Sequence, residues 1–127
     1  DKPLTICDTG HNVGGMQYTT RQLATTPHQT LHIVIGMVND KDVNTVLSML
    51  PQDATYYFTQ ASVKRAMPCD QFSQEASRHG LKGQCYPTVH DAYLAAKAAS
   101  GEEDLIFIGG STFIVADLFA AMEQEKR

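Results

Sequence analysis

The chain has 127 residues, enough for one domain with a single core and too few for two ordinary ones. It is 43% hydrophobic and 19% charged, which is the balance of a water-soluble globular protein. A formal net charge of −4 without a Lys/Arg cluster argues against a nucleic-acid partner, and no apolar run approaches the length of a membrane span.

The N-terminus lacks the basic start and the long apolar stretch of a signal peptide, so we expect a cytoplasmic protein. A first residue other than Met fits a fragment of a longer protein. Cys7, Cys69 and Cys85 form no CxxC pair and no Cys/His cluster with zinc spacing, which suits a reducing compartment. We expect each cysteine to be a small buried hydrophobe or an inert thiol, and we expect no metal site.

The first half of the chain predicts strands alternating with helices. Residues 4–8 form a short candidate strand, and helical spacing follows over 13–24. Residues 30–37 have the near-continuous apolar run of a buried parallel strand, within which His32 is expected to be packed. Apolar residues then fall at i, i+3, i+4 and i+7 over 43–50, which predicts an amphipathic helix ended by a proline.

The second half continues this alternation. Residues 54–59 are rich in Tyr and Phe and predict a third strand. Pro68 suits the first turn of the next helix, and Gly80 suits its C-terminal end. Residues 83–86 are the weakest of the candidate strands.

After these residues, Thr88 and Asp91 have the spacing of a capping box that opens a helix to about Ser100. Residues 104–108 predict a fifth strand, followed by a final helix. The whole pattern predicts an α/β fold: an open, mostly parallel sheet of about five to six strands with helices on both faces. One strand could be antiparallel.

Ligands of such sheets bind beyond the carboxyl ends of the strands. The loops there are 8–12, 37–41, 59–65 and 109–112, and we expect them to share one edge of the sheet. Asp8 could accept hydrogen bonds from a ribose diol, His11 could contact a phosphate or acyl-phosphate, and Asn12 is a natural N-cap. The alternative is a capped turn in which Asp8 and His11 bond only to neighbouring backbone.

The other loops also carry candidate ligands. Around Ser111, glycines followed by hydroxyls could admit a carboxylate or phosphate, or could simply form a tight turn with a helix cap. Lys41 could face a cleft as a cation, and Arg65 could clamp a carboxylate. Each of the two could equally be a solvated surface residue.

The string DTGHNVGG at 8–15 resembles the D-x-A/G-H-N motif of folylpolyglutamate and dihydrofolate synthases in the Mur ligase superfamily. Residues 36–42 resemble the family loop that ends in D-K-D, 64–66 its R-A segment, and 109–113 its G-S-L-Y segment. These matches come in family order and span nearly the whole chain. The sequence departs from the family at Val13, where Pro is usual, and at 112–113.

The resemblance implies a Rossmann-like, three-layer C-terminal domain of an ATP-dependent amide ligase. In such enzymes a P-loop ATPase domain precedes it, ATP phosphorylates a folate or dihydropteroate carboxylate, and L-glutamate attacks the acyl-phosphate. By the same resemblance Asp8 lies at the ATP ribose, His11 faces the interdomain cleft as a catalytic residue, and Ser111 lies near the amino-acid substrate. The chain has no GxxxxGK[ST], so we expect Mg²⁺ to be held mainly by the other domain and the isolated fragment to be inactive.

Two alternatives remain. The parent could be a peptidoglycan-precursor ligase of the same superfamily, although the His-Asn pair after the aspartate favours the folate branch. The chain could also be a non-catalytic α/β interaction module. A ligase domain predicts that Asp8, His11 and Ser111 face one open groove, whereas an interaction module predicts that they are dispersed or internally satisfied. We expect a monomer in either case.

Overall fold

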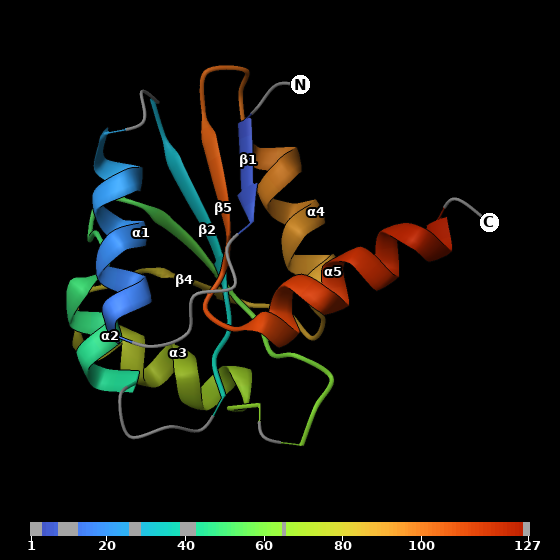
Figure 1. Ribbon diagram of the computed structural model, residues 1–127, viewed down its shortest axis with the longest axis horizontal. Coiled ribbons are helices and arrows are strands. Elements are labelled where there is room, and N and C mark those ends of the chain that lie inside the picture. The colour runs from blue at the N-terminus through green and yellow to red at the C-terminus, as the bar shows by residue number, and fades with distance from the viewer. Residues whose placement is uncertain (1–3, 8–12, 26–28, 39–42, 65, 126–127) are drawn as a thin grey trace.

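The computed structural model describes residues 4–7, 13–25, 29–38, 43–64 and 66–125. Within these ranges five strands form one sheet in the order β1-β5-β2-β3-β4, and every pair is parallel (Figure 1). The strands are β1 (Leu4–Cys7), β2 (Leu31–Ile35), β3 (Thr55–Phe58), β4 (Gly83–Cys85) and β5 (Leu105–Gly109). The predicted open sheet is therefore confirmed, and no described strand is antiparallel.

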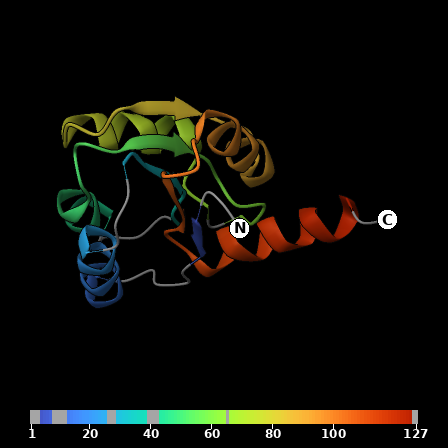
Figure 2. The same ribbon diagram turned by 90° about the horizontal axis from the view of Figure 1, so that it is seen from above.

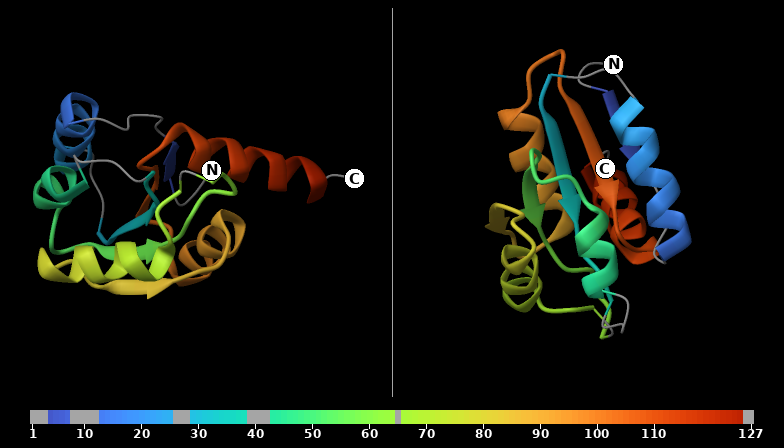
Figure 3. Two further views of the ribbon diagram at one scale, coloured as in Figure 1. Left: turned by 90° about the horizontal axis from the view of Figure 1, so that it is seen from below. Right: turned by 90° about the vertical axis from the view of Figure 1, so that its left-hand side faces the viewer.

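Helices cover both faces of this sheet, as predicted (Figures 1–3). One face carries α1 (Val13–Thr25), α2 (Val43–Met49) and α3 (Cys69–Arg78). The other face carries α4 (Val89–Ala99) and α5 (Thr112–Glu125). The C-terminal half of α5 projects beyond the rest of the molecule (Figures 1 and 2), and Phe119 on it is 57% exposed.

The two central strands supply both halves of the core. Ile33 and Ile35 of β2 pack under α2 and α3, while Val34 between them packs on the α4 side. Strand β5 alternates in the same way, with Phe107 on the first face and Ile106 on the second. Because both faces are covered, both orientations of side chain must be apolar, which explains the continuous apolar runs in the sequence.

Helix ends follow the sequence signals closely. The hydroxyl of Thr88 accepts a hydrogen bond from the backbone N–H of Asp91 at 3.1 Å, as the capping box predicts. Gly80 follows the end of α3 with φ +78°, a conformation that favours glycine. Pro68 is the N-cap of α3 rather than part of its first turn, because its ψ of 139° is extended. Among the described helices, none is long and apolar enough to cross a membrane.

Candidate functional site

The described parts of the predicted ligand loops meet at the carboxyl edge of the sheet. Thr59 donates its backbone N–H to the carbonyl of Ile35 at 2.9 Å, which ties the turn after β3 to the end of β2. Gly36 donates to Gly109 at 3.4 Å, which ties the turn after β2 to the end of β5. Cys7, the last residue of β1, pairs with Ile108, so β1 ends at this edge too. The prediction of one shared edge is confirmed for the described residues of the loops after β2, β3 and β5, whereas loop 8–12 lies outside the described residues.

A further contact joins the second and third loops. Val38 and Ala66 form an antiparallel bridge, and the N–H of Met67 donates to the carbonyl of Met37 at 2.8 Å. The loops that follow β2 and β3 are therefore held against each other beyond the sheet. We call these joined turns, residues 36–38, 59–64, 66–67 and 109–111, the rim. They lie far apart in the sequence.

Two glycines allow the turns of this rim to pack closely. Gly110 has φ +96°, and a Cβ there would lie 2.5 Å from the carbonyl oxygen of Gly36. A Cβ at Gly36 would lie 2.5 Å from the carbonyl oxygen of Thr59. Backbone approaches this short leave no room for a side chain. The sequence suggested that Gly110 admits a ligand, but its observed neighbour is the backbone of the adjacent turn.

Ser111 forms the cap of α5. Its Oγ accepts a hydrogen bond from the N–H of Phe113 at 3.0 Å, and its carbonyl accepts one from Ile114 at 3.2 Å. The residue is only 2% exposed. The capping alternative is thus observed, and the expectation that this hydroxyl faces an open groove is not met in the chain by itself. A contact with glutamate remains a prediction.

The remaining predicted site residues, Asp8, His11, Asn12, Lys41 and Arg65, lie outside the described residues. In the sequence, Asp8 directly follows Cys7 at the end of β1, and Arg65 directly precedes Ala66 of the bridge. Among the residues that the structure describes, no group of three or more His, Cys, Asp or Glu side chains could hold a metal ion.

A buried polar network lies at the opposite end of the sheet. His32 is 4% exposed; its Nδ1 lies 2.8 Å from the hydroxyl oxygen of Tyr57, and its Nε2 lies 2.9 Å from Oδ2 of Asp104. The carboxylate of Asp104 also accepts from the N–H groups of Thr30 and Gly101. These bonds, that of Gly101 first and that of His32 next, lower the pKa of Asp104 below its usual 3.8.

This network confirms that His32 is packed within the sheet. Because His32 and Asp104 lie at the amino ends of β2 and β5, the network is remote from the carboxyl edge. The network gives the buried imidazole of His32 its hydrogen-bond partners and joins β2 to β5. The sequence did not predict the network, since its members are brought together only by strand order.

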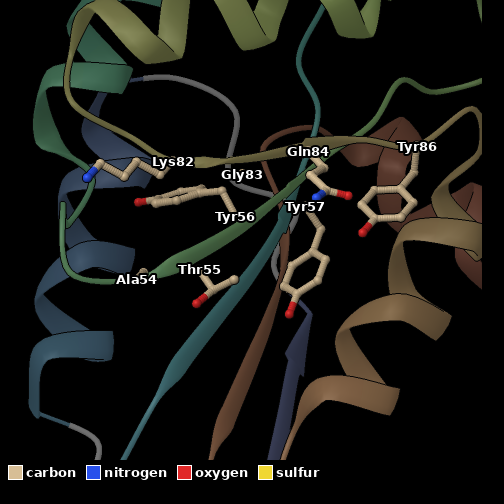
Figure 4. A pocket seen from close by; sticks show the side chains of 8 residues that line it. All are labelled: Ala54, Thr55, Tyr56, Tyr57, Lys82, Gly83, Gln84 and Tyr86. Carbon is tan, nitrogen blue, oxygen red and sulfur yellow. The ribbon is translucent and has the colours of Figure 1, made fainter.

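A hollow of ≈ 530 Å³ lies along the β3 and β4 segments (Figure 4). It is lined by residues 54–57 of the β3 segment, 82–84 of the β4 segment, and Tyr86. Figure 4 shows the side chains of Tyr57 and Tyr86 side by side, and their ring centroids are 6.0 Å apart. The hollow runs along the open β4 side of the sheet, so we do not assign it to the rim.

Comparison with known proteins identifies the family. The model of the family described as "Mur ligase, glutamate ligase domain" matches residues 1–112. The dihydrofolate synthase/folylpolyglutamate synthase of Escherichia coli K12 is 26% identical over 128 residues, which cover 99% of this chain and 29% of that protein. A probable bifunctional folylpolyglutamate synthase/dihydropteroate synthase of Haloferax volcanii is 26% identical over 91% of this chain and 14% of its own length.

Solved structures agree. Escherichia coli FolC in complex with DHPP and ADP matches with a TM-score of 0.86 and 26% identity, over 98% of this chain and 30% of that one. A bifunctional folylpolyglutamate synthase/dihydrofolate synthase with Mn, AMPPNP and L-glutamate bound matches with a TM-score of 0.84 and 25% identity, over 95% and 29%. The chain thus spans less than a third of these relatives. The match over residues 1–112, with this fold, shows that the chain belongs to the Mur ligase glutamate ligase domain family.

Proposed function

We propose that this chain is the C-terminal domain of an ATP-dependent amide ligase that adds L-glutamate to folate or dihydropteroate through an acyl-phosphate. The observation that carries the proposal is the family match over residues 1–112. It is supported by a rim at the carboxyl edge of the sheet, built from the same segments whose sequence resembles the folate branch. The ligand classes come from the related structures, one of which is a complex with DHPP and ADP and another a complex with Mn, AMPPNP and L-glutamate.

In this proposal ATP and Mg²⁺ bind between the chain and a preceding P-loop ATPase domain that holds most of the metal contacts. The β- and γ-phosphates require a phosphate-binding loop, and none occurs in these 127 residues. Asp8 would accept hydrogen bonds from the ribose, and His11 with Asn12 would contribute polar groups at the start of α1. An N-terminal helix end favours an anion through its unpaired N–H groups and dipole.

The rim would contribute by closing over the reacting groups. Phosphoryl transfer depends mainly on positioning and on neutralising charge. Acyl-phosphates hydrolyse readily, so a domain that excludes water protects the intermediate until glutamate attacks. Hydrogen bonds join the turns after β2, β3 and β5 to one another, which suits a surface that must meet another domain in one geometry.

The proposal also gives roles to Lys41, Arg65 and Ser111. We propose that Lys41 and Arg65 face the cleft and contact carboxylates or the partner domain. Ser111 would act first as the cap that sets the direction of α5. A direct contact between Ser111 and glutamate requires the turn to open, because the hydroxyl is buried in the chain alone.

The proposal is tested by glutamate-dependent ADP release from the full-length protein, with dihydropteroate and with a reduced folate as acceptors. Asp8→Ala should raise the KM for ATP by about tenfold or more, since a hydrogen bond to a charged group contributes about 1.5–3 kcal/mol. His11→Ala should lower kcat. Glu102→Ala, which changes an exposed residue away from the rim, serves as the control and should behave like the wild type.

Unchanged kinetics of Asp8→Ala and His11→Ala would exclude their proposed roles. Turnover that needs a peptidoglycan precursor instead of a folate would place the protein in the other branch of the superfamily. Absence of any ATP-dependent ligation by the folded full-length protein would favour an interaction module.

A further inference from the structure

The fold brings two of the three cysteines together. Strand β4 pairs with β3 in a register that sets Cys85 beside Phe58. Register partners in a parallel sheet project their side chains to the same face. The ring of Phe58 packs in the core beneath α3, so Cys85 is directed to the side where α3 begins at Cys69.

A shared backbone carbonyl fixes this proximity. The oxygen of Phe58 accepts a hydrogen bond from the thiol of Cys69 at 3.0 Å. The same oxygen accepts from the N–H of Tyr86, the residue after Cys85, at 2.8 Å. Helix α3 also packs directly against β4. The thiol of Cys69 and the backbone that follows Cys85 therefore meet at one carbonyl.

The two thiols differ in exposure. Cys85 lies on the edge strand and is exposed, whereas Cys69 is buried at 6% exposure. Burial first, and the adjacent Cys85 thiol next, raise the pKa of Cys69 to about 12. Cys85 is thus the thiol that an external reagent reaches first.

We propose that Cys69 and Cys85 form a dithiol modification site that closes to an intrachain disulfide when a low-molecular-weight disulfide reacts at Cys85. The thiolate of Cys85 attacks one sulfur of oxidised glutathione and displaces one glutathione thiolate, which leaves a mixed disulfide on Cys85. The sulfur of Cys69 then attacks Sγ of Cys85 and expels the second glutathione, whose sulfur takes up the proton that Cys69 loses. Two protein thiols are oxidised by two electrons, and one glutathione disulfide is reduced to two glutathione molecules.

The site is independent of the proposed ligase function. Its closure would tie the start of α3 to β4 just behind the loop after β3. That loop already contacts α3, because the side-chain oxygen of Gln60 accepts a hydrogen bond from the N–H of Cys69 at 2.8 Å. The modification would therefore stiffen one side of the rim.

The test treats the folded full chain with oxidised glutathione and measures intact mass and disulfide-linked peptides. A Cys7→Ser background removes the other exposed cysteine. We expect this protein to lose the mass of two hydrogen atoms and to yield a peptide pair joined through Cys69 and Cys85. In the same background Cys69→Ser should retain one glutathione on Cys85, and Cys85→Ser should remain unmodified.

A lasting glutathione adduct on Cys85 while Cys69 is present would overturn the proposal. So would a link that forms only after denaturation, or modification of Cys69 in the Cys85→Ser variant at the rate seen with Cys85 present. The mass readout does not depend on ligase activity, so failure of one proposal leaves the other standing.

Discussion

Replacement of Ser111 by Ala tests how the rim is held. The change removes the oxygen that accepts the N–H of Phe113 at 3.0 Å, and it does so at a residue only 2% exposed. Loss of a serine cap costs about 0.5–2 kcal/mol. The orphaned N–H of Phe113 is partly buried, and an unmet buried donor costs about 1–3 kcal/mol, so we expect a loss of about 1.5 kcal/mol.

Thr88→Ala is the matched control. It removes the equivalent cap of α4, a bond of 3.1 Å to Asp91, but at an exposed residue where water can replace the hydroxyl. We expect about 1 kcal/mol for this change. Urea unfolding of both variants, followed by circular dichroism, gives the comparison. A smaller loss for Ser111→Ala than for Thr88→Ala would refute the reasoning that burial makes this cap the stronger one.

Three other predictions concern the rest of the fold and the reaction. Asp104→Asn should lower the free energy of unfolding at neutral pH by about 2 kcal/mol, because His32 loses a charged hydrogen-bond acceptor. Its control, Glu75→Gln, changes an exposed ion pair and should cost under about 0.5 kcal/mol. Since the pKa of Asp104 is lowered on folding, this contribution is present above its usual 3.8 and is lost as pH falls through the folded value; the Asp104→Asn deficit in urea unfolding should therefore shrink in acid. Gly110→Ala should cost more than about 2 kcal/mol, from its positive φ and the contact with the neighbouring turn, while Gly101→Ala, whose Cβ would meet nothing within 4 Å, should change thermal stability by less than about 0.5 kcal/mol. The isolated 127-residue chain should release no ADP in a coupled assay, and turnover that Asp8→Ala abolishes would contradict that expectation.

Much of the fold could be predicted because its signals are local. The apolar runs of β2 and β5 follow directly from burial on both faces, and the helix ends at Thr88 and Gly80 follow from capping and from a positive φ. Strand β4 was the weakest prediction because an edge strand of three exposed residues carries no hydrophobic pattern. Its parallel direction follows from its connection to β3 and could not be read from its own residues.

The site was predictable only in part. Sequence reasoning placed the turns after β2, β3 and β5 at one edge, since parallel strands end together, and the structure confirms this for the described residues. It did not determine whether Ser111 caps a helix or faces a ligand, because both roles use the same short hydroxyl side chain. The structure shows the cap, whereas a contact with a ligand remains a prediction.

The features that sequence reasoning missed are non-local. His32, Tyr57 and Asp104 form one network, and Cys69 meets Cys85, only because of strand order and register. We expected each cysteine to be either buried or inert. Cys69 is buried, whereas Cys7 and Cys85 are exposed. A pair of cysteines without a CxxC spacing gives no local sign of proximity.

The product that the full-length protein forms is the most direct test of the proposed role of the chain. We predict that, with ATP, Mg²⁺, L-glutamate and either dihydropteroate or a reduced folate, ADP and a glutamyl amide appear in equal amounts by chromatography and mass spectrometry. Omission of glutamate should abolish the amide. ADP formation without that amide, or an amide formed only with a peptidoglycan precursor, would contradict the assignment to the folate branch.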